Sequence, residues 1–316
     1  MKTRQAVLLK PGRFGFREVE LQPDAGQLLI KVEACGLCNW ELTHWRGQTG
    51  TCPQTLGHEW CGTVAQTGEG VTKFRVGDRV AVQPSLGLAG FADYALNTED
   101  TTFLVDDGVE LKYAIAEPVK CITTVVRGAA PEAGDYGAVV GCGPMGLWSI
   151  MALKSGGLGA LIAVDTDPQR LELARKFGAT HIINSTEQDP AQAIRNITGG
   201  HFCDFIVEGT GAPGVLEACF HWIRTHRGRI CMMSSAVPGP IDMTEAVERG
   251  CVILYTHPPY SGDQADDLRR AVMLINNGTY RIKELITHEF KLADIQTAFE
   301  TYSSKPKGYL KGIVIP

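Results

Sequence analysis

The sequence lacks a long apolar run, an excess of positive charge and a signal for export. No stretch approaches the roughly 18 consecutive apolar residues of a membrane-spanning helix. The first residues, from Met1 to Pro11, contain only a short apolar run before a lysine, unlike the apolar centre of a secretory signal. The net charge of -5 offers no general attraction for nucleic acid or anionic lipid. These absences predict a cytoplasmic protein that acts on a small molecule and binds neither nucleic acid nor a membrane.

Cysteine is also too sparse for a disulfide scaffold. The chain has 10 cysteines in 316 residues, and without an export signal we expect their thiols to be reduced and most of them to pack as small apolar side chains. Cys35 and Cys38 form a CxxC pair. No second pair lies at zinc-ribbon spacing, and the pair does not lie in a thioredoxin-like βαβ unit. Cys38 therefore needs another interpretation.

The pattern of the sequence changes near residue 120. Residues 1 to about 117 are dense in glycine and in short alternating runs, which predicts a small all-β unit. From there on, short apolar runs alternate with helical stretches, which predicts parallel βαβ units in a doubly wound sheet. The predicted strands are 137–140, 160–164, 181–183, 204–207, 228–233 and 251–255.

The length of 316 residues fits about two domains. We predict an α/β protein in which residues 1–119 form the first part of one domain and residues 120–257 form the doubly wound domain. Residues 258–316 then return to the first domain. The exposed edge of the doubly wound sheet invites pairing between copies of the chain.

A glycine-rich motif follows the first strand of the doubly wound domain. The motif is Gly141-Cys142-Gly143-Pro144-Met145-Gly146, and an apolar helix comes after it. Gly141 would permit a tight turn, Gly143 would let a pyrophosphate approach the backbone, and Gly146 would let the helix pack closely on the strand. The N-terminus of the helix would supply N–H donors to the phosphates.

An aspartate supports the same interpretation. Asp165 ends the next strand, where its carboxylate can accept hydrogen bonds from both ribose hydroxyls of an adenosine and would repel a 2′-phosphate. We therefore predict NAD, although Arg170 nearby weakens the preference over NADP. The predicted cofactor-binding residues are Gly141, Gly143, Pro144, Met145, Gly146, Asp165 and Arg170. The alternative is a glycine turn without a cofactor, with the aspartate capping the helix 168–177.

Several short sequence motifs, taken together, resemble those of a known family. They are Cys35-Gly-Leu-Cys38-Asn-Trp-Glu-Leu-Thr-His44-Trp, Leu56-Gly-His58-Glu59-Trp-Cys-Gly-Thr-Val, Gly77-Asp-Arg-Val, Phe91-Ala-Asp-Tyr, Ala116-Glu117-Pro118 and the glycine motif. Over essentially the whole chain they resemble the zinc-dependent medium-chain dehydrogenase/reductase family of the alcohol dehydrogenase superfamily. The resemblance implies a GroES-like β-barrel catalytic domain, an inserted Rossmann domain, and a homodimer or homotetramer. The Glu117-Pro118 motif is similar to the motif found in the sorbitol-dehydrogenase branch of that family.

The resemblance also implies a metal site. Its zinc ligands would be Cys38, His58 and Glu117, with Glu59 either binding directly or supporting the site. A thiolate, an imidazole and a carboxylate leave one tetrahedral position open for water or substrate, as in a catalytic site. Taken singly, the residues could be a buried thiol, a core histidine and a carboxylate at a helix start. No cysteine lies in 81–90, where the family's structural zinc lobe would be, so we expect one catalytic zinc and no structural zinc.

The implied reaction interconverts a secondary alcohol (a polyol, sugar or cyclitol) and its ketone by hydride transfer, with zinc as a Lewis acid. The proton path departs from the family pattern, which has Ser or Thr two residues after the cysteine ligand and His three residues further on. Here Trp40 and Thr43 hold these positions, and His44 comes one place late. We hypothesise that Thr43, His44 or a water on Glu59 replaces the relay. His44 could instead lie at the barrel surface.

Trp40 would point toward the zinc. It would narrow the pocket or offer its aromatic face to the C–H side of a sugar ring, and a packing role is equally open. Two other functions are alternatives for the whole chain. One is a zinc-free reductase of an activated carbonyl or alkene, and the other is a relative that binds NAD without turnover.

Overall fold

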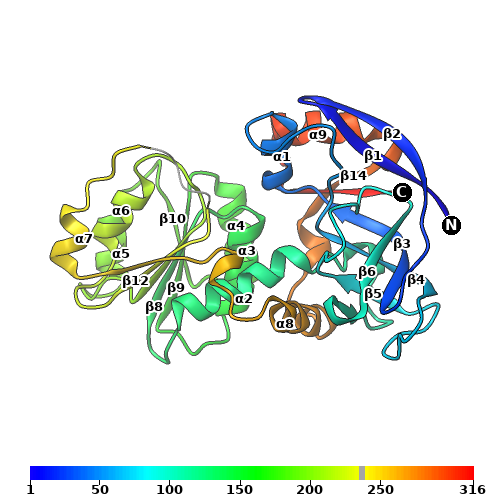
Figure 1. The fold of residues 1–316 in the computed structure, drawn as a ribbon. Helices are drawn as coiled ribbons and strands as arrows, with labels where there is room; N and C mark the ends of the chain where they lie inside the picture. Colours follow the sequence, from blue (N-terminus) through cyan, green and yellow to red (C-terminus); the bar gives the residue numbers. More distant parts are fainter. Residues whose placement is uncertain (235–238) are drawn as a thin grey trace. The chain divides into compact units, whose positions relative to one another are not determined.

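The computed structural model describes residues 1–234 and 239–316, and the chain divides into two compact units (Figure 1). Unit 1 comprises Met1–Lys120 and Ala265–Pro316, and unit 2 is Cys121–Gln264. The chain therefore returns to unit 1 after Gln264, whereas the predicted boundary was residue 257. His257 explains part of this difference, because its Nε2 lies 2.9 Å from the carbonyl oxygen of Ser234 in unit 2. Among the described residues, no helix is both long and apolar enough to cross a membrane.

Unit 1 contains a two-stranded ribbon and a seven-stranded sheet. The ribbon pairs β1 (Lys2–Lys10) with β2 (Arg13–Glu20). The sheet has the order β14-β15-β3-β4-β5-β7, and β6 also pairs with β3. Its strands are β3 (Gln27–Gly36), β4 (Trp60–Thr67), β5 (Arg79–Val82), β6 (Tyr94–Thr98), β7 (Thr102–Leu104), β14 (Ile286–Lys291) and β15 (Lys311–Ile315). The helices are α1 (Asn39–Trp45), α8 (Gln264–Asn276), α9 (Ile295–Ser304) and the start of α2 (Glu117–Ala129).

The core of unit 1 lies between the sheet and α9. Leu28 and Ile30 of β3 are fully buried, as is Phe299 of α9. The Phe299 ring packs on Phe14 and Phe91 at centroid distances of 4.7 and 5.7 Å. This burial of apolar and aromatic surface is the main stabilising contribution of the unit.

The prediction of an all-β first region is wrong at α1. This helix has only 7 residues, so an apolar helical period has no room to show in the sequence. A local hydrogen bond starts the helix: the Glu41 carboxylate accepts the backbone N–H of Cys38 at 3.1 Å. That spacing of three residues is typical of a capping box.

Unit 2 is a doubly wound sheet of six parallel strands in the order β10-β9-β8-β11-β12-β13. The strands are β8 (Tyr136–Val140), β9 (Ala160–Asp165), β10 (His181–Asn184), β11 (Phe205–Glu208), β12 (Arg229–Met232) and β13 (Val252–Tyr255). All six predicted strands are confirmed, each to within one residue at either end. The order of the strands is that of the Rossmann fold, in which ligands bind where the order reverses, here between β8 and β11.

The helices of unit 2 lie on both faces of the sheet. Besides the remainder of α2, they are α3 (Pro144–Leu153), α4 (Pro168–Phe177), α5 (Pro190–Ile197), α6 (Val215–Trp222) and α7 (Thr244–Arg249). Figure 1 shows α3 and α4 on one side of the sheet, with α5 and α6 on the other. The strands are buried between these layers, which explains why they appear in the sequence as continuous apolar runs.

Candidate metal centre and dinucleotide site

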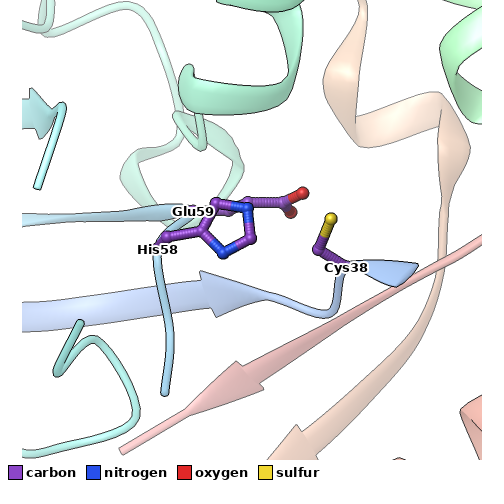
Figure 2. A group of neighbouring side chains, drawn as sticks. All are labelled: Cys38, His58 and Glu59. Carbon is purple, nitrogen blue, oxygen red and sulfur yellow. The ribbon is translucent and has the colours of Figure 1, made fainter. Parts of the chain in front are cut away.

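The pairing of β3 with β4 brings together the two segments that contain Cys38 and His58-Glu59. Cys38 follows β3, and His58 and Glu59 come directly before β4. Because the strands are antiparallel with Cys35 opposite Trp60, the end of β3 lies beside the start of β4. The potential ligand atoms of Cys38, His58 and Glu59 therefore lie within 4.8 Å of one another (Figure 2).

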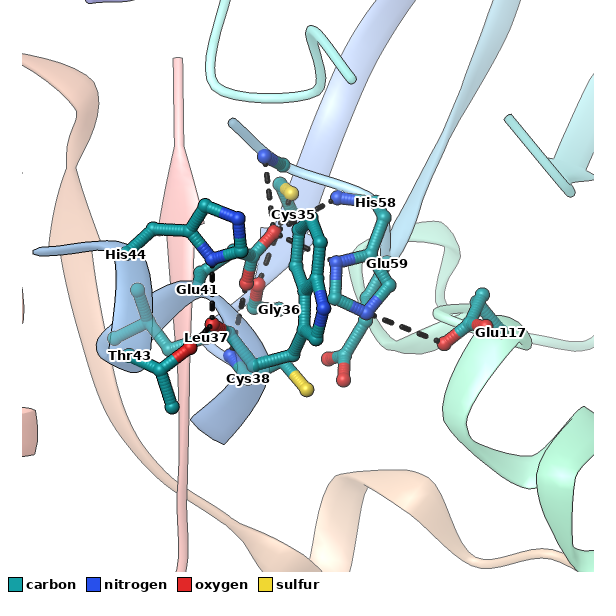
Figure 3. A network of polar contacts seen from close by, with 12 residues as sticks. Cys35, Gly36, Leu37, Cys38, Glu41, Thr43, His44, His58, Glu59 and Glu117 are labelled. Carbon is teal, nitrogen blue, oxygen red and sulfur yellow. Dashed lines mark hydrogen bonds and ion pairs between the residues drawn. The ribbon is translucent and has the colours of Figure 1, made fainter. Parts of the chain in front are cut away.

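Glu117 lies at the margin of this group. It begins α2, and its Oε2 lies 3.6 Å from Nε2 of His58 (Figure 3). Glu117 and Glu59 are buried, and Cys38 and His58 are partly buried. The structure thus places all four residues that the resemblance implies in one region of unit 1.

The donor set fits zinc. A thiol, an imidazole and carboxylates at one place are the ligand types of catalytic zinc sites, whereas magnesium or calcium would favour oxygen donors alone. Burial raises the pKa of the Cys38 thiol, and the Glu59 carboxylate raises it further. A metal would therefore displace a proton from this sulfur on binding. Cys35 lies outside the group, fully buried, with its Sγ directed at the carbonyl oxygen of Gly36.

Glu41 of α1 orients His58, and the sequence reasoning missed it. Its Oε1 lies 2.8 Å from Nδ1 of His58 and accepts the backbone N–H groups of Gly57 and His58 at 2.9 and 3.0 Å. The other ring nitrogen, Nε2, is then left to face Cys38 and Glu117, as in metal sites where a carboxylate fixes the ligand histidine. The capping-box spacing from Cys38 to Glu41 was the signal that could have found this residue.

The charges around His58 favour its protonated form in the metal-free chain. Burial disfavours the charge, but the Glu41 and Glu117 carboxylates outweigh it and raise the pKa of His58 well above its usual value. An imidazolium cannot bind a metal, so metal and protons compete for this residue.

Two buried lysines, also missed, pair with the two carboxylates beside His58. Lys120 Nζ lies 2.9 Å from Oε1 of Glu117, and Lys311 Nζ contacts Oε2 of Glu59 and donates to the carbonyl oxygen of Leu37 at 3.0 Å. Burial opposes the charge of Glu117, but His58 and Lys120 lower the pKa of its carboxyl. Each carboxylate thus has one oxygen engaged by an ammonium group. The position of Lys311 within the apolar run of the last strand was the available signal for its burial.

Thr43 and His44 do not join this group. His44 Nδ1 lies 3.0 Å from the carbonyl oxygen of Trp40 and 3.2 Å from Oγ1 of Thr49. Thr43 Oγ1 donates to the same carbonyl oxygen at 2.7 Å and bonds Thr49 Oγ1 at 2.7 Å. These hydrogen bonds stay within α1 and the turn that follows it. His44 is 6% exposed, so the alternative that it lies at the barrel surface is wrong.

The glycine motif lies at the carboxyl end of β8, where the strand order of unit 2 reverses. Gly141 has a φ of +91°, which a tight turn there requires. A Cβ on Gly146 would lie 1.9 Å from the carbonyl oxygen of Gly141, so only glycine lets the helix pack this closely. A Cβ on Gly143 would meet no atom within 4 Å. Pro144 begins α3, a position where its missing N–H costs nothing.

Asp165 ends β9 and holds the turn together. Its Oδ2 accepts the backbone N–H of Cys142 at 2.6 Å and its Oδ1 accepts that of Asp167 at 2.9 Å. The cap of α4 is Asp167, not Asp165, so the alternative of a capping role for Asp165 is wrong. Arg170 makes a long contact to Asp167, with 3.7 Å between Nε and Oδ2.

Glu208 was missed by the sequence reasoning and lies across the switch point, at the end of β11. Its Oε1 accepts the backbone N–H groups of Thr210 and Gly211 at 2.7 and 3.1 Å. Its Oε2 accepts the hydroxyl of Ser234, which follows β12. The carboxylate therefore fixes the two loops at this edge of the sheet. An acidic residue directly after an apolar strand was the available signal.

Comparison with known proteins identifies the family. Residues 24–124 match the alcohol dehydrogenase GroES-like domain, and residues 144–256 match the zinc-binding dehydrogenase domain. The chain is 30% identical to the L-threonine 3-dehydrogenase of Bacillus licheniformis, with 99% of each chain covered, and 29% identical to the sorbitol dehydrogenase of Bacillus subtilis, with 95% of each covered. It superposes on the crystal structure of the 2R,3R-butanediol dehydrogenase of Bacillus subtilis with a TM-score of 0.87 and 28% identity, covering 99% of each chain. The chain therefore belongs to the zinc-type medium-chain dehydrogenases of the alcohol dehydrogenase superfamily, oxidoreductases that combine a GroES-like and a Rossmann domain.

Proposed function

We propose that the protein is a zinc- and NAD-dependent dehydrogenase that interconverts a secondary alcohol of the polyol, sugar or cyclitol class and its ketone. In the oxidative direction, the alcohol and NAD⁺ give the ketone, NADH and one proton. The observation that carries the proposal is the gathering of Cys38, His58, Glu59 and Glu117 at one place in unit 1. The relatives named for sorbitol, butanediol and threonine support oxidation of a CH–OH group.

Cys38, His58 and Glu117 would hold the zinc, and Glu59 would complete or support the site. When bound, zinc supplies a Lewis acid for the alcohol oxygen and the nicotinamide supplies the hydride acceptor. The chain's own residues prepare the site. Glu41 turns Nε2 of His58 toward the group, and the lysines beside the two other carboxylates offset part of their buried negative charge.

The proton needs a different path from that of the relatives with Ser or Thr at the position of Trp40. Of the three candidates, Thr43 and His44 form hydrogen bonds, among the described residues, within α1 and the turn that follows it. Glu59 is the one that lies in the group of potential ligands. We therefore assign the uptake of the proton to a water held at Glu59.

Asp165 favours NAD. Its carboxylate lies at the end of β9, where the charge would repel the 2′-phosphate of NADP. Arg170, the nearby cation that could bind that phosphate, makes an exposed contact with Asp167 instead. The glycine turn and the N-terminus of α3 would bind the pyrophosphate.

Initial-rate measurements test the proposal. NADH absorbance is followed with a panel of polyols, pyranosides and cyclitols, with NAD⁺ or NADP⁺, before and after zinc is removed by a chelator and restored. We expect turnover with NAD⁺ that disappears on chelation and returns with zinc. Turnover that survives chelation would favour the zinc-free reductase. NAD binding without turnover on any alcohol would favour the relative that has lost its activity.

A further inference from the structure

Trp40 is the exposed member of the candidate site. It is the second residue of α1, and the residue is 46% exposed beside a group that is otherwise largely buried. Its ring meets the imidazole of His58 edge-on, with 5.5 Å between the centroids and an angle of 86°. A single exposed aromatic residue is ordinary on a protein surface. This one touches a candidate metal ligand.

A second, buried ring holds the indole in place. The His44 imidazole lies 4.0 Å from the Trp40 ring, centroid to centroid, at an angle of 48°. His44 Nδ1 faces the carbonyl oxygen of Trp40, which can only accept, so this nitrogen carries a proton and donates it. A Cβ on Gly50 would fall 2.3 Å from Cδ2 of His44, so the backbone confines the ring on that side. His44 is therefore fixed against Trp40 and does not reach the ligand group.

The geometry points to a platform for the substrate. We infer that Trp40 determines specificity by stacking its indole, a partly exposed ring, on the C–H side of a ring-shaped polyhydroxylated secondary alcohol, a cyclitol or a pyranose sugar, and that His44 is the residue that positions it. This inference rests on the proposed function, which supplies the reaction at the hydroxyl group.

The shape of the substrate follows from the shape of the indole. The face of an aromatic ring carries partial negative charge and attracts polarised C–H bonds that lie against it. A six-membered ring presents several C–H bonds on one side, whereas an open-chain polyol turns its C–H bonds in different directions. Because the indole touches His58, a ring that lies against it would be next to one of the candidate ligands. An open chain would gain less from the same surface.

Steady-state kinetics with Trp40→Ala and Trp40→Phe test the platform. The probes are myo-inositol, methyl pyranosides, sorbitol as an open-chain polyol, and 2-butanol as an alcohol too small to cover the indole. We expect the wild type to prefer a ring. In Trp40→Ala, the KM for that ring should rise roughly tenfold, several times more than the KM for 2-butanol, and Trp40→Phe should recover most of the loss. The zinc content of the same variants, measured in parallel, should stay at the wild-type level while the KM changes.

Two variants of His44 separate positioning from proton transfer. His44→Phe keeps a ring against the indole, whereas His44→Ala removes it. Positioning predicts that the KM for the ring substrate rises more in His44→Ala than in His44→Phe. Proton transfer predicts instead that both variants lose kcat equally and lose the same limb of the pH–rate profile, and this result would overturn the role that we give to His44.

The outcomes distinguish the two proposals. If open-chain alcohols are oxidised as well as rings, or if Trp40→Ala affects all substrates alike, the platform is wrong while the proposed function stands. If no alcohol yields NADH, the proposed function fails first and the platform fails with it. A preference for rings that depends on an aromatic residue at position 40 supports both.

Discussion

The two candidate sites are built in different ways. The metal group of unit 1 consists of side chains that follow β3, precede β4 and begin α2. Strand pairing brings the first two segments together, and the charges of the group are buried and paired. The dinucleotide site of unit 2 is chiefly a stretch of backbone, six consecutive residues that run from the end of β8 into the first turn of α3, and its shape depends on glycine. The first site therefore depends on charge and the second on the absence of side chains. Substitutions should affect the two independently.

The largest effect should come from Gly146→Val and its counterpart His58→Ala. A side chain at position 146 would collide with the carbonyl oxygen of Gly141, so we expect NADH binding to weaken at least a hundredfold while zinc is retained. His58→Ala should do the reverse: zinc is lost, NADH binding stays, and kcat falls roughly a thousandfold or more. Fluorescence titration with NADH and metal analysis measure the two properties. Loss of both properties in either variant would mean that the sites are not independent.

The next largest effect should come from Glu41. Its carboxylate holds Nδ1 of His58 and two backbone N–H groups, and removing such a support typically costs about 10–100-fold in metal affinity. We expect Glu41→Gln to weaken zinc binding by this factor, measured by competition with a chromophoric chelator. Glu33→Gln, on the exposed side of β3, is the matched control. Unchanged zinc affinity in Glu41→Gln would show that His58 needs no orientation.

Lys120→Met should lower the stability of the zinc-free chain. The side chain of Lys120 is 2% exposed and pairs with Glu117, and removing one partner of a buried ion pair costs roughly 3 kcal/mol in unfolding free energy. The pKa of Glu117 is lowered in the folded chain. Its contribution is thus present above the unfolded pKa of about 4.3 and is lost as the pH falls through the folded value.

Urea unfolding of the chelated protein checks this prediction. The difference between the wild type and Lys120→Met should be largest near pH 7 and should shrink as the pH falls below about 4. Lys73→Met, which removes an exposed pair with Asp100, is the control and should change the unfolding free energy much less than Lys120→Met does. An equal effect of the two variants would contradict a buried charge pair at Glu117.

The smallest effect should come from Asp165→Asn. The amide keeps only one of the two acceptors that hold the turn and loses the charge that would repel a 2′-phosphate. We expect the ratio of kcat/KM for NAD⁺ to that for NADP⁺ to fall roughly tenfold, mainly through a better KM for NADP⁺. Asp167→Asn, which retains a good helix cap, should leave the ratio within about twofold. A ratio that does not move in Asp165→Asn would remove the basis for preferring NAD.

The same contrast explains what could be predicted from the sequence. The turn at Gly141 is local, because its strand, its glycines and its helix are consecutive in the sequence. The six strands of unit 2 are also predictable from local apolar runs, to within one residue at either end. Cys38, His58 and Glu117 are distant in sequence, and only the resemblance to a family joined them.

The residues that sequence reasoning missed share a physical reason. Glu41, Lys120, Lys311 and Glu208 act through contacts with residues that their own neighbourhood does not reveal. A charged residue is exposed in most proteins, so burial of these four could not be expected from composition. The hypothesis for His44 depended on its position after Cys38, but the helical turn directs its Nδ1 back to the carbonyl oxygen of Trp40.

The central claim is that Cys38, His58 and the nearby carboxylates hold a zinc on which turnover depends. Mass-spectrometric metal analysis of the purified wild type, Cys38→Ser and Cys35→Ala, with NADH formation measured on the same samples, tests it most directly. Cys35 is a buried cysteine three residues away and outside the group, which makes it the matched control. The account predicts about one zinc per chain in the wild type and in Cys35→Ala, and loss of zinc together with turnover in Cys38→Ser. A folded wild type that forms NADH without zinc would contradict it.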